Sequence, residues 1–450
     1  MSDHVPQLRS FVAASEAFAL EQDTPAAFLE RCLAVYEARD AKVKAFAAVN
    51  LEGARAAAQA STARWKAGKP LSRIDGMPIG IKDIIESIDM PTGMGSSLYD
   101  GWRSNRDAAT VHALREAGAV IVGKTVTTEF AASPPGPTRN PHDLARTPGG
   151  SSSGSAAAVG AGMLAAGLGT QVVGSIIRPA GYCGGWGYKP SVGGLNRGGS
   201  HDYLSQSCAG VIAASRADTW QVAREIVVRA GGDPGFPGIA GPEAPPNAVA
   251  PRALAFVETA GWSVANLDAK SALKGLMGTL AAAGIEIITR ETHEAVTALE
   301  RVMPEVLPLT RRIIAWEGRW PLNTYAERDA SKLSASALER LRDAEAMSID
   351  DYRAGIARRD EIRAIHARLA DIADACITLS APDVAPVGIE TTGNPIFAVP
   401  ASLLGVPALS MPLLKLGGLP LGVQLVGFAA RDADLFAAAG AVERIVYGTP

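Results

Sequence analysis

Two segments of the sequence place reactive side chains where chemistry is favoured over a purely structural role. The glycine- and serine-rich loop Gly149–Gly154 opens a run of small residues, and a tight turn further along carries one serine, Ser175. Glycine lets backbone N–H groups approach a ligand closely, because it has no Cβ atom. Upstream, Lys82 stands inside the apolar run Met77–Ile85, although lysine is seldom buried without a partner. We therefore expect these segments to form a site.

Other interpretations fit the surrounding sequence less well. Gly150–Gly154 matches the G-x-S-x-G pattern of a serine hydrolase, but that motif needs a buried strand before it and residues 140–148 are typical of turns. A flexible linker is disfavoured because an apolar segment that must be buried follows at once. Gly118–Thr125 matches the P-loop pattern, yet its variable positions, Ala-Val-Ile-Val, predict a strand instead of a phosphate-binding loop.

The positions of the histidines limit which residue could act as the base of such a site. None of the six lies inside these motifs, and no HExxH or paired Cys/His spacing suggests a metal. A lysine acts as base only when neutral, and lowering its pKa from about 10.4 to about 7.4 costs roughly 4 kcal/mol, which burial can supply. Asp83 should point to the opposite face of the strand. Lys82 is thus the candidate base, the structural alternative being a lysine that reaches the surface. We expect no metal and no cofactor.

The motifs GIKD, GGSSSGSAAAVGAG and LGTQVVGSIIRPAGYCG resemble the amidase signature family. The intervals of 69 and 24 residues between Lys82, Ser151 and Ser175 are similar to those of its Ser–cis-Ser–Lys triad. The resemblance implies that Ser175 is the nucleophile, that Ser151 relays its proton after a cis Gly150–Ser151 bond, and that Lys82 is the base. It also implies an oxyanion hole made by the backbone N–H groups of Val172, Val173, Gly174 and Ser175.

The nucleophile loop departs from the family's common version, TDTGGSIR. Gln171 replaces the aspartate, Val173 replaces a glycine, and Arg178 follows Ser175 by three residues instead of two. This variant resembles the malonamidase-like branch, in which that arginine binds a substrate carboxylate, a role that suits its planar fork. An internal salt bridge that supports the loop is equally compatible with Arg178. We also place Gln171 and Gly150 among the substrate contacts.

The overall composition is that of a soluble globular protein, with 47% hydrophobic and 20% charged residues. A net charge of −3 favours neither a nucleic-acid surface nor an acidic membrane partner. The four cysteines form no CxxC pair, which indicates free thiols in a reducing compartment. The start, MSDHVPQLRS, lacks the basic and apolar regions of a signal peptide. We therefore expect a cytoplasmic protein.

Candidate strands alternate with helices over much of the chain, which predicts an α/β fold. The resemblance implies one large domain with a mixed, largely parallel central sheet covered by helices on both faces. Its expected parts are N-terminal helices (1–66), a catalytic core (70–230), a helical insertion over the active site (293–372) and a C-terminal completion of the core (375–445), within a single domain spanning 1–450.

The resemblance implies an amidase that cleaves a small linear amide, with or without a carboxylate, through an acyl-enzyme. The expected partner is this small-molecule amide, with no nucleic acid and no membrane, and a homodimer is compatible with the family. One alternative is the glutaminase-like subunit of a tRNA-dependent amidotransferase, which needs partner subunits and usually keeps the aspartate that Gln171 replaces. Another is a non-catalytic amide-binding protein on the same fold.

Overall fold

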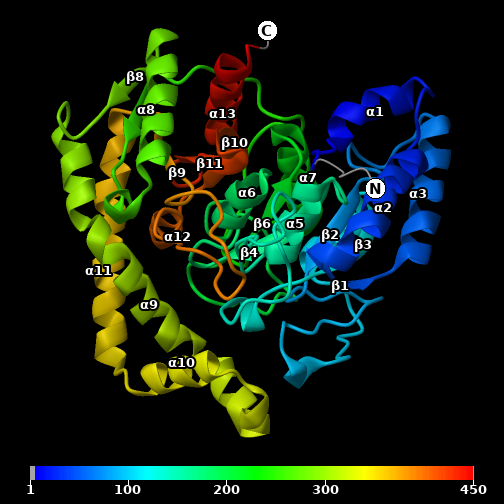
Figure 1. Ribbon diagram of the computed structural model, residues 1–450, viewed down its shortest axis with the longest axis horizontal. Coiled ribbons are helices and arrows are strands. Elements are labelled where there is room, and N and C mark those ends of the chain that lie inside the picture. The colour runs from blue at the N-terminus through cyan, green and yellow to red at the C-terminus, as the bar shows by residue number, and fades with distance from the viewer. Residues whose placement is uncertain (1–5, 449–450) are drawn as a thin grey trace.

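An eleven-stranded mixed β-sheet forms the centre of the computed structural model, which describes residues 6–448 (Figure 1). The strands lie in the order β1-β3-β2-β4-β6-β5-β10-β11-β9-β7-β8. Their bounds are β1 (Phe46–Val49), β2 (Pro78–Lys82), β3 (Val120–Thr125), β4 (Ala166–Gln171), β5 (Trp186–Lys189), β6 (Cys208–Ala213), β7 (Ala253–Phe256), β8 (Glu286–Ile288), β9 (Ala375–Leu379), β10 (Ala408–Leu416) and β11 (Leu419–Val426).

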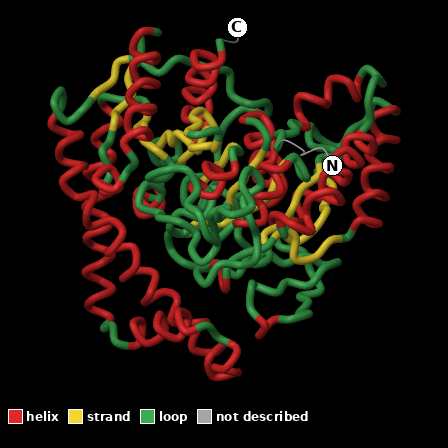
Figure 2. The backbone as a smooth tube through the Cα atoms, viewed as in Figure 1, coloured by secondary structure: helices red, strands yellow, loops and turns green. Residues whose placement is uncertain are grey.

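Helices surround this sheet, and long loops gather between them near the middle of the molecule (Figure 2). Those of the described residues are α1 (Phe11–Ala19), α2 (Pro25–Val43), α3 (Leu51–Lys66), α4 (Ala109–Glu116), α5 (Ser153–Ala161), α6 (Ile177–Cys183), α7 (Arg216–Ala230), α8 (Leu267–Ala282), α9 (Glu294–Asp329), α10 (Ala335–Glu345), α11 (Ile349–Ala367), α12 (Val399–Leu404) and α13 (Asp432–Tyr447). Across residues 6–448, no helix combines the length and apolar character needed to cross a membrane.

The expected α/β class with a mixed sheet is confirmed, but the sheet is less parallel than expected. Six of its ten strand pairings in the described residues are antiparallel. The β10–β11 hairpin shows one cause. Gly417 and Gly418 join these strands and both have positive φ, at 57° and 83°. Two-residue hairpin loops favour this conformation, which glycine adopts without steric cost.

Several local predictions agree closely with the structure, and one strand was not expected. The helical region predicted over 293–372 contains α9, α10 and α11, which form an arm at the left and lower side of Figure 1. The variable residues of the P-loop pattern lie in and next to β3, as their apolar character predicts. The edge strand β1 interrupts the helices expected within 1–66. The first five residues of the segment read for a signal peptide lie outside the described residues.

The sheet brings the motifs that the sequence predicts to be catalytic together through two neighbouring parallel strands. β2 pairs with β4 in parallel, with Ile79 opposite Ala166, so both strands end at the same edge of the sheet. Lys82 is the last residue of β2, and the turn that carries Ser175 follows β4. In α/β sheets ligands bind outside the carboxyl ends of parallel strands. Residues far apart in the sequence therefore meet at one edge.

Candidate active site

Lys82 is fully buried and faces only neutral oxygen atoms. Its side chain is 0% exposed, and Nζ lies 2.7 Å from Ser151 Oγ, 2.8 Å from Thr170 Oγ1 and 3.4 Å from the Thr170 carbonyl oxygen. Desolvation by this burial lowers the pKa of Lys82 to about 7, and the negative charge of Asp202 partly opposes the shift. The amine therefore titrates near neutral pH, as a general base requires.

The neighbouring carboxylate, Asp83, does not contact this amine. It forms a buried ion pair with Lys124 on β3, at 3.0 Å between Nζ and Oδ1, and accepts a hydrogen bond from the Gly93 N–H. Alternation along β2 directs the two side chains to opposite faces. Of the two buried lysines on the adjacent strands β2 and β3, the one with a carboxylate partner is Lys124.

Ser151 follows a cis Gly150–Ser151 peptide bond and precedes helix α5. Arg178 Nη2 donates to the Gly150 carbonyl oxygen at 2.7 Å and to Thr392 Oγ1 at 2.8 Å. A Cβ atom on Gly150 would lie 2.6 Å from Thr392 Cγ2, so the backbone here approaches its neighbour closely enough to require glycine. These contacts fix the peptide group that carries Ser151.

Ser175 lies at the wall of the same cavity as Ser151 and is 7% exposed. Its hydroxyl group makes no hydrogen bond to any residue from 6 to 448. The backbone N–H groups of Val172 to Ser175 also donate to no described residue. The carbonyl oxygens of Val172 and Val173 accept hydrogen bonds from Gln206 Nε2 (2.9 Å) and Ser402 Oγ (3.1 Å). The N–H groups of this turn are therefore unpaired in the described chain, while two of its carbonyl groups are held by hydrogen bonds from Gln206 and Ser402.

Gln171 lies behind the nucleophile loop, with both ends of its amide engaged. Nε2 donates to Ser402 Oγ at 3.0 Å, and Oε1 accepts from the N–H groups of Ile176 and Ile177 at 2.9 and 3.0 Å. The two accepted bonds satisfy free N–H groups at the start of α6, as a capping side chain does. The sequence analysis placed Gln171 among the substrate contacts. Its side chain instead supports the loop, and it does not line the cavity.

Arg178 is buried beside the loop, and its guanidinium pairs with neutral oxygens. No carboxylate of the described residues lies in salt-bridge range of it, and its Nε is buried without a hydrogen-bond partner. Burial lowers the pKa of Arg178 to about 10. The sequence was also compatible with an internal salt bridge of Arg178. The structure has hydrogen bonds to Gly150 and Thr392 in its place.

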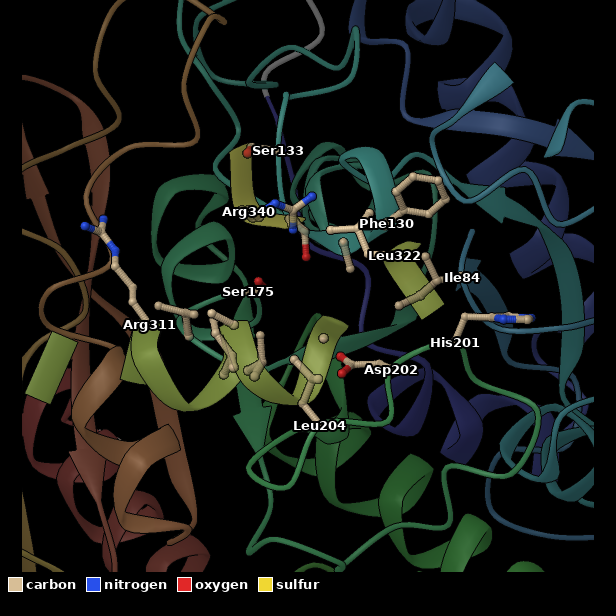
Figure 3. Close-up of a pocket in the computed structure, with 18 of the residues that line it drawn as sticks. Ile84, Phe130, Ser133, Ser175, His201, Asp202, Leu204, Arg311, Leu322 and Arg340 are labelled. Atoms are coloured by element: carbon tan, nitrogen blue, oxygen red, sulfur yellow. The ribbon is translucent and has the colours of Figure 1, made fainter. Parts of the chain in front are cut away.

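The cavity has a volume of about 500 Å³ and is closed on one side by α9 and α10 (Figure 3). This volume is typical of a small-molecule site. Besides Ser151, Ser175 and Arg178, its wall includes polar residues that the sequence patterns did not indicate, among them Asp202, Arg340 and Thr392. Within residues 6–448 no group of three or more His, Cys, Asp or Glu side chains is arranged to hold a metal ion.

The sequence matches the family described as Amidase over residues 27–436. It is 34% identical to a glutamyl-tRNA(Gln) amidotransferase subunit of Anaeromyxobacter sp. (strain K), across 92% of both chains. Among solved structures, an amidase matches with a TM-score of 0.82 and 27% identity, covering 97% of this chain and 99% of that one. The corresponding amidotransferase subunit of Thermotoga maritima matches with a TM-score of 0.74 and 25% identity, covering 97% and 96%.

The expected partners were a small-molecule amide, with no nucleic acid, no membrane and a homodimer compatible with the family. These relatives contradict the expectation of a chain that acts on such an amide without other protein subunits and without nucleic acid. Relatives similar over more than nine-tenths of their length are instead named as a subunit of an amidotransferase for glutamyl-tRNA(Gln), so this expectation is wrong. The physical reason is that net charge is a sum over the whole chain. It carries no information on what neighbouring subunits bind.

Proposed function

The chain belongs to the amidase signature family, and from that premise we propose that it cleaves a carboxylic amide through an acyl-enzyme on Ser175. We propose further that glutamine is the amide and that the chain works as the glutamine-hydrolysing subunit of a tRNA-dependent amidotransferase. The identity to one subunit of such an assembly, across 92% of both chains, supports this second part. An assembly acting on tRNA would work in the cytoplasm.

The observation that carries the proposal is the environment of Lys82 Nζ. A neutral amine has two N–H donors and one lone pair. The two oxygens of Thr170 can accept the two N–H groups, and the lone pair then remains for the hydroxyl proton of Ser151. A charged amine could donate to all three oxygens, but no carboxylate contacts it and burial disfavours the charge. Lys82 is therefore prepared to receive a proton from Ser151.

Acyl transfer then proceeds along one chain of hydroxyl groups. Ser175 Oγ attacks the carbonyl carbon, its proton passes to Ser151 Oγ, and the proton of Ser151 passes to Lys82 Nζ. The same route returns a proton to the leaving nitrogen, the C–N bond breaks, and ammonia departs. Water hydrolyses the acyl-enzyme by the same relay. Catalytic hydrogen bonds are often long without substrate, which accounts for the unpaired Ser175 hydroxyl.

The backbone turn before Ser175 supplies electrostatic stabilisation. The free N–H groups of Val172, Val173, Gly174 and Ser175 would donate to the oxyanion that forms on the substrate carbonyl. Loss of one such donor typically costs roughly 2.7–4 kcal/mol of transition-state stabilisation. Gln171 would act on the reaction by holding this turn against α6, and Arg178 by fixing the Gly150 carbonyl.

The proposal is tested by glutamine hydrolysis and by labelling of the full chain. Ser175→Ala and Lys82→Ala should each remove glutamine turnover by the chain assembled with its partner subunits, while a fluorophosphonate should modify Ser175 in the wild type. Ser133→Ala is the matched control, because Ser133 also lines the cavity but lies outside the relay. It should keep both turnover and labelling.

Two results would contradict the two parts of the proposal separately. Full glutamine turnover by the Lys82→Ala variant would exclude the lysine as base. Equal turnover of glutamine by the isolated chain and the assembly, with no ammonia passed to glutamyl-tRNA, would exclude the amidotransferase role and leave the hydrolytic chemistry intact.

A further inference from the structure

The cavity contains two charged groups that form no hydrogen bond or ion pair with Lys82, Ser151 or Ser175 in the described chain. Asp202 and Arg340 belong to its wall, and neither forms an ion pair with a residue of the described range. We propose that Asp202 binds the ammonium group, and Arg340 the carboxylate group, of an α-amino acid whose side-chain amide is presented to Ser175. This inference rests on the proposed function and names the residues that select its substrate.

Asp202 is a buried carboxylate with capacity for a further donor. It is 7% exposed, and one of its oxygens accepts a hydrogen bond from the Ser207 hydroxyl group. The second oxygen has no hydrogen-bond partner in residues 6–448. A buried charge is costly unless it is paired. An ammonium group of a ligand, which has three N–H donors and a positive charge, would satisfy both needs.

Arg340 supplies the opposite charge from helix α10. Its Nε donates to the Ser336 carbonyl oxygen at 3.3 Å, whereas Nη2 is buried and has no partner in the described chain. The acidic side chain whose charge acts on it, Glu129, accepts hydrogen bonds from the backbone and side chain of Ser334. The guanidinium therefore keeps donors for a ligand, and carboxylates accept them in a two-pronged geometry.

The other charged groups of the cavity are less suited to this task. Arg311 and Asp343 are exposed at its rim, where water competes for them. Arg178 already donates to the protein backbone. In Figure 3 the Arg340 side chain lies above Ser175 and the Asp202 side chain lies below it and to its right. A ligand bound by both side chains would carry one positive and one negative group, and it would present an uncharged group to the catalytic serine.

Glutamine has this distribution of groups. Its ammonium and carboxylate share one carbon, and a two-methylene chain separates that carbon from the amide. The inference is tested by calorimetric binding to the full chain carrying Ser175→Ala, so that turnover is not needed. The ligands are glutamine, glutaramate (which lacks the ammonium), 4-aminobutyramide (which lacks the carboxylate) and butyramide (which lacks both).

We expect glutamine to bind about ten- to a hundredfold more tightly than either singly charged amide, because hydrogen bonds to charged groups have this effect. Asp202→Asn should abolish the difference between glutamine and glutaramate while leaving that between glutaramate and butyramide. Arg340→Met should abolish the difference between glutamine and 4-aminobutyramide. Arg311→Met and Asp343→Asn make the same charge changes at the rim and should alter none of these ratios.

Equal affinity for the four ligands, or parallel losses for all four in the two variants, would overturn the inference. Thermal melting of each variant identifies a loss that comes from misfolding; if Arg340→Met melts early, Arg340→Lys must still lose the two-pronged contact and weaken glutamine. Charge-dependent binding without turnover of glutamine by the wild type would refute the proposed function and leave the recognition of the two charges standing.

Discussion

Replacing Lys82 with methionine gives the sharpest test of the buried neutral amine, because it predicts a stability that depends on pH. The folded protein holds this amine at a pKa of about 7, whereas in an unfolded chain it has a pKa of about 10.4. Between these values the unfolded state binds more protons, so stability rises with pH. The destabilisation that comes from the lowered pKa of Lys82 is absent above the unfolded pKa and reaches a constant maximum below about pH 7.

The magnitude follows from the two pKa values. Protonation of the unfolded chain destabilises the wild type by about 4 kcal/mol at pH 7 and by about 1 kcal/mol at pH 10. Lys82→Met also leaves Ser151 and Thr170 without a partner, at a cost of about 1–3 kcal/mol for each buried group. That cost does not vary with pH over this range. The difference in unfolding free energy between wild type and variant should therefore change by about 3 kcal/mol from pH 7 to pH 10.

Urea unfolding of both proteins at pH 7, 8, 9 and 10 measures this change. Lys66→Met, at the exposed end of α3, is the control for loss of a lysine and should follow the wild type at every pH. If the curves of Lys82→Met and the wild type stayed parallel, the amine would have an ordinary pKa in the folded state, and the argument for a neutral base would fail.

Four further outcomes follow from the same contacts. The kcat/KM for glutamine should rise with pH through about 7 and then level off as Lys82 loses its proton, and a fall over that range would contradict a neutral base. Gly150→Ala should lower activity at least tenfold because its Cβ meets Thr392 Cγ2, and Thr392→Ser, which lacks that methyl, should restore part of it in the double variant. Gln171→Leu should lower the unfolding free energy by about 1–3 kcal/mol in urea titrations, since two N–H groups at α6 lose their acceptor. Arg178→Ala should reduce kcat for charged and neutral amides alike if the arginine supports the loop; a rise in KM confined to acidic amides would show that it binds substrate.

The sequence indicated the residues proposed for the reaction better than it indicated the residues proposed to bind the substrate. Lys82 stands out because a lone lysine in an apolar strand is improbable without a task, and the glycine-rich loop indicates close backbone approach. Asp202 and Arg340 carry no such signal. One follows a run of turns and the other lies on an amphipathic helix, where an arginine is usually solvated. That both residues line one cavity depends on how α9 and α10 pack together beside the rest of the chain, which no local pattern specifies.

The surroundings of Lys82 and Lys124 on the adjacent strands β2 and β3 explain how two buried lysines can have different roles. β2 and β3 carry Lys82 and Lys124 near the same sheet edge but on opposite faces, since Lys124 lies opposite Ile81 and Lys82 lies opposite Thr125, and both amines are removed from water. The fold provides Asp83 at 3.0 Å to Lys124 and only neutral oxygens to Lys82. Burial lowers the pKa of both amines, but the Asp83 carboxylate opposes this shift at Lys124, whereas no carboxylate contacts Lys82, which is pushed further towards the neutral form that can accept a proton. Exchange of the two environments, for example a carboxylate at Thr170, should therefore convert the base into a second structural ion pair. The Thr170→Asp variant is expected to lose glutamine turnover while retaining its fold, and retention of activity would show that neutrality of Lys82 is not what the reaction requires.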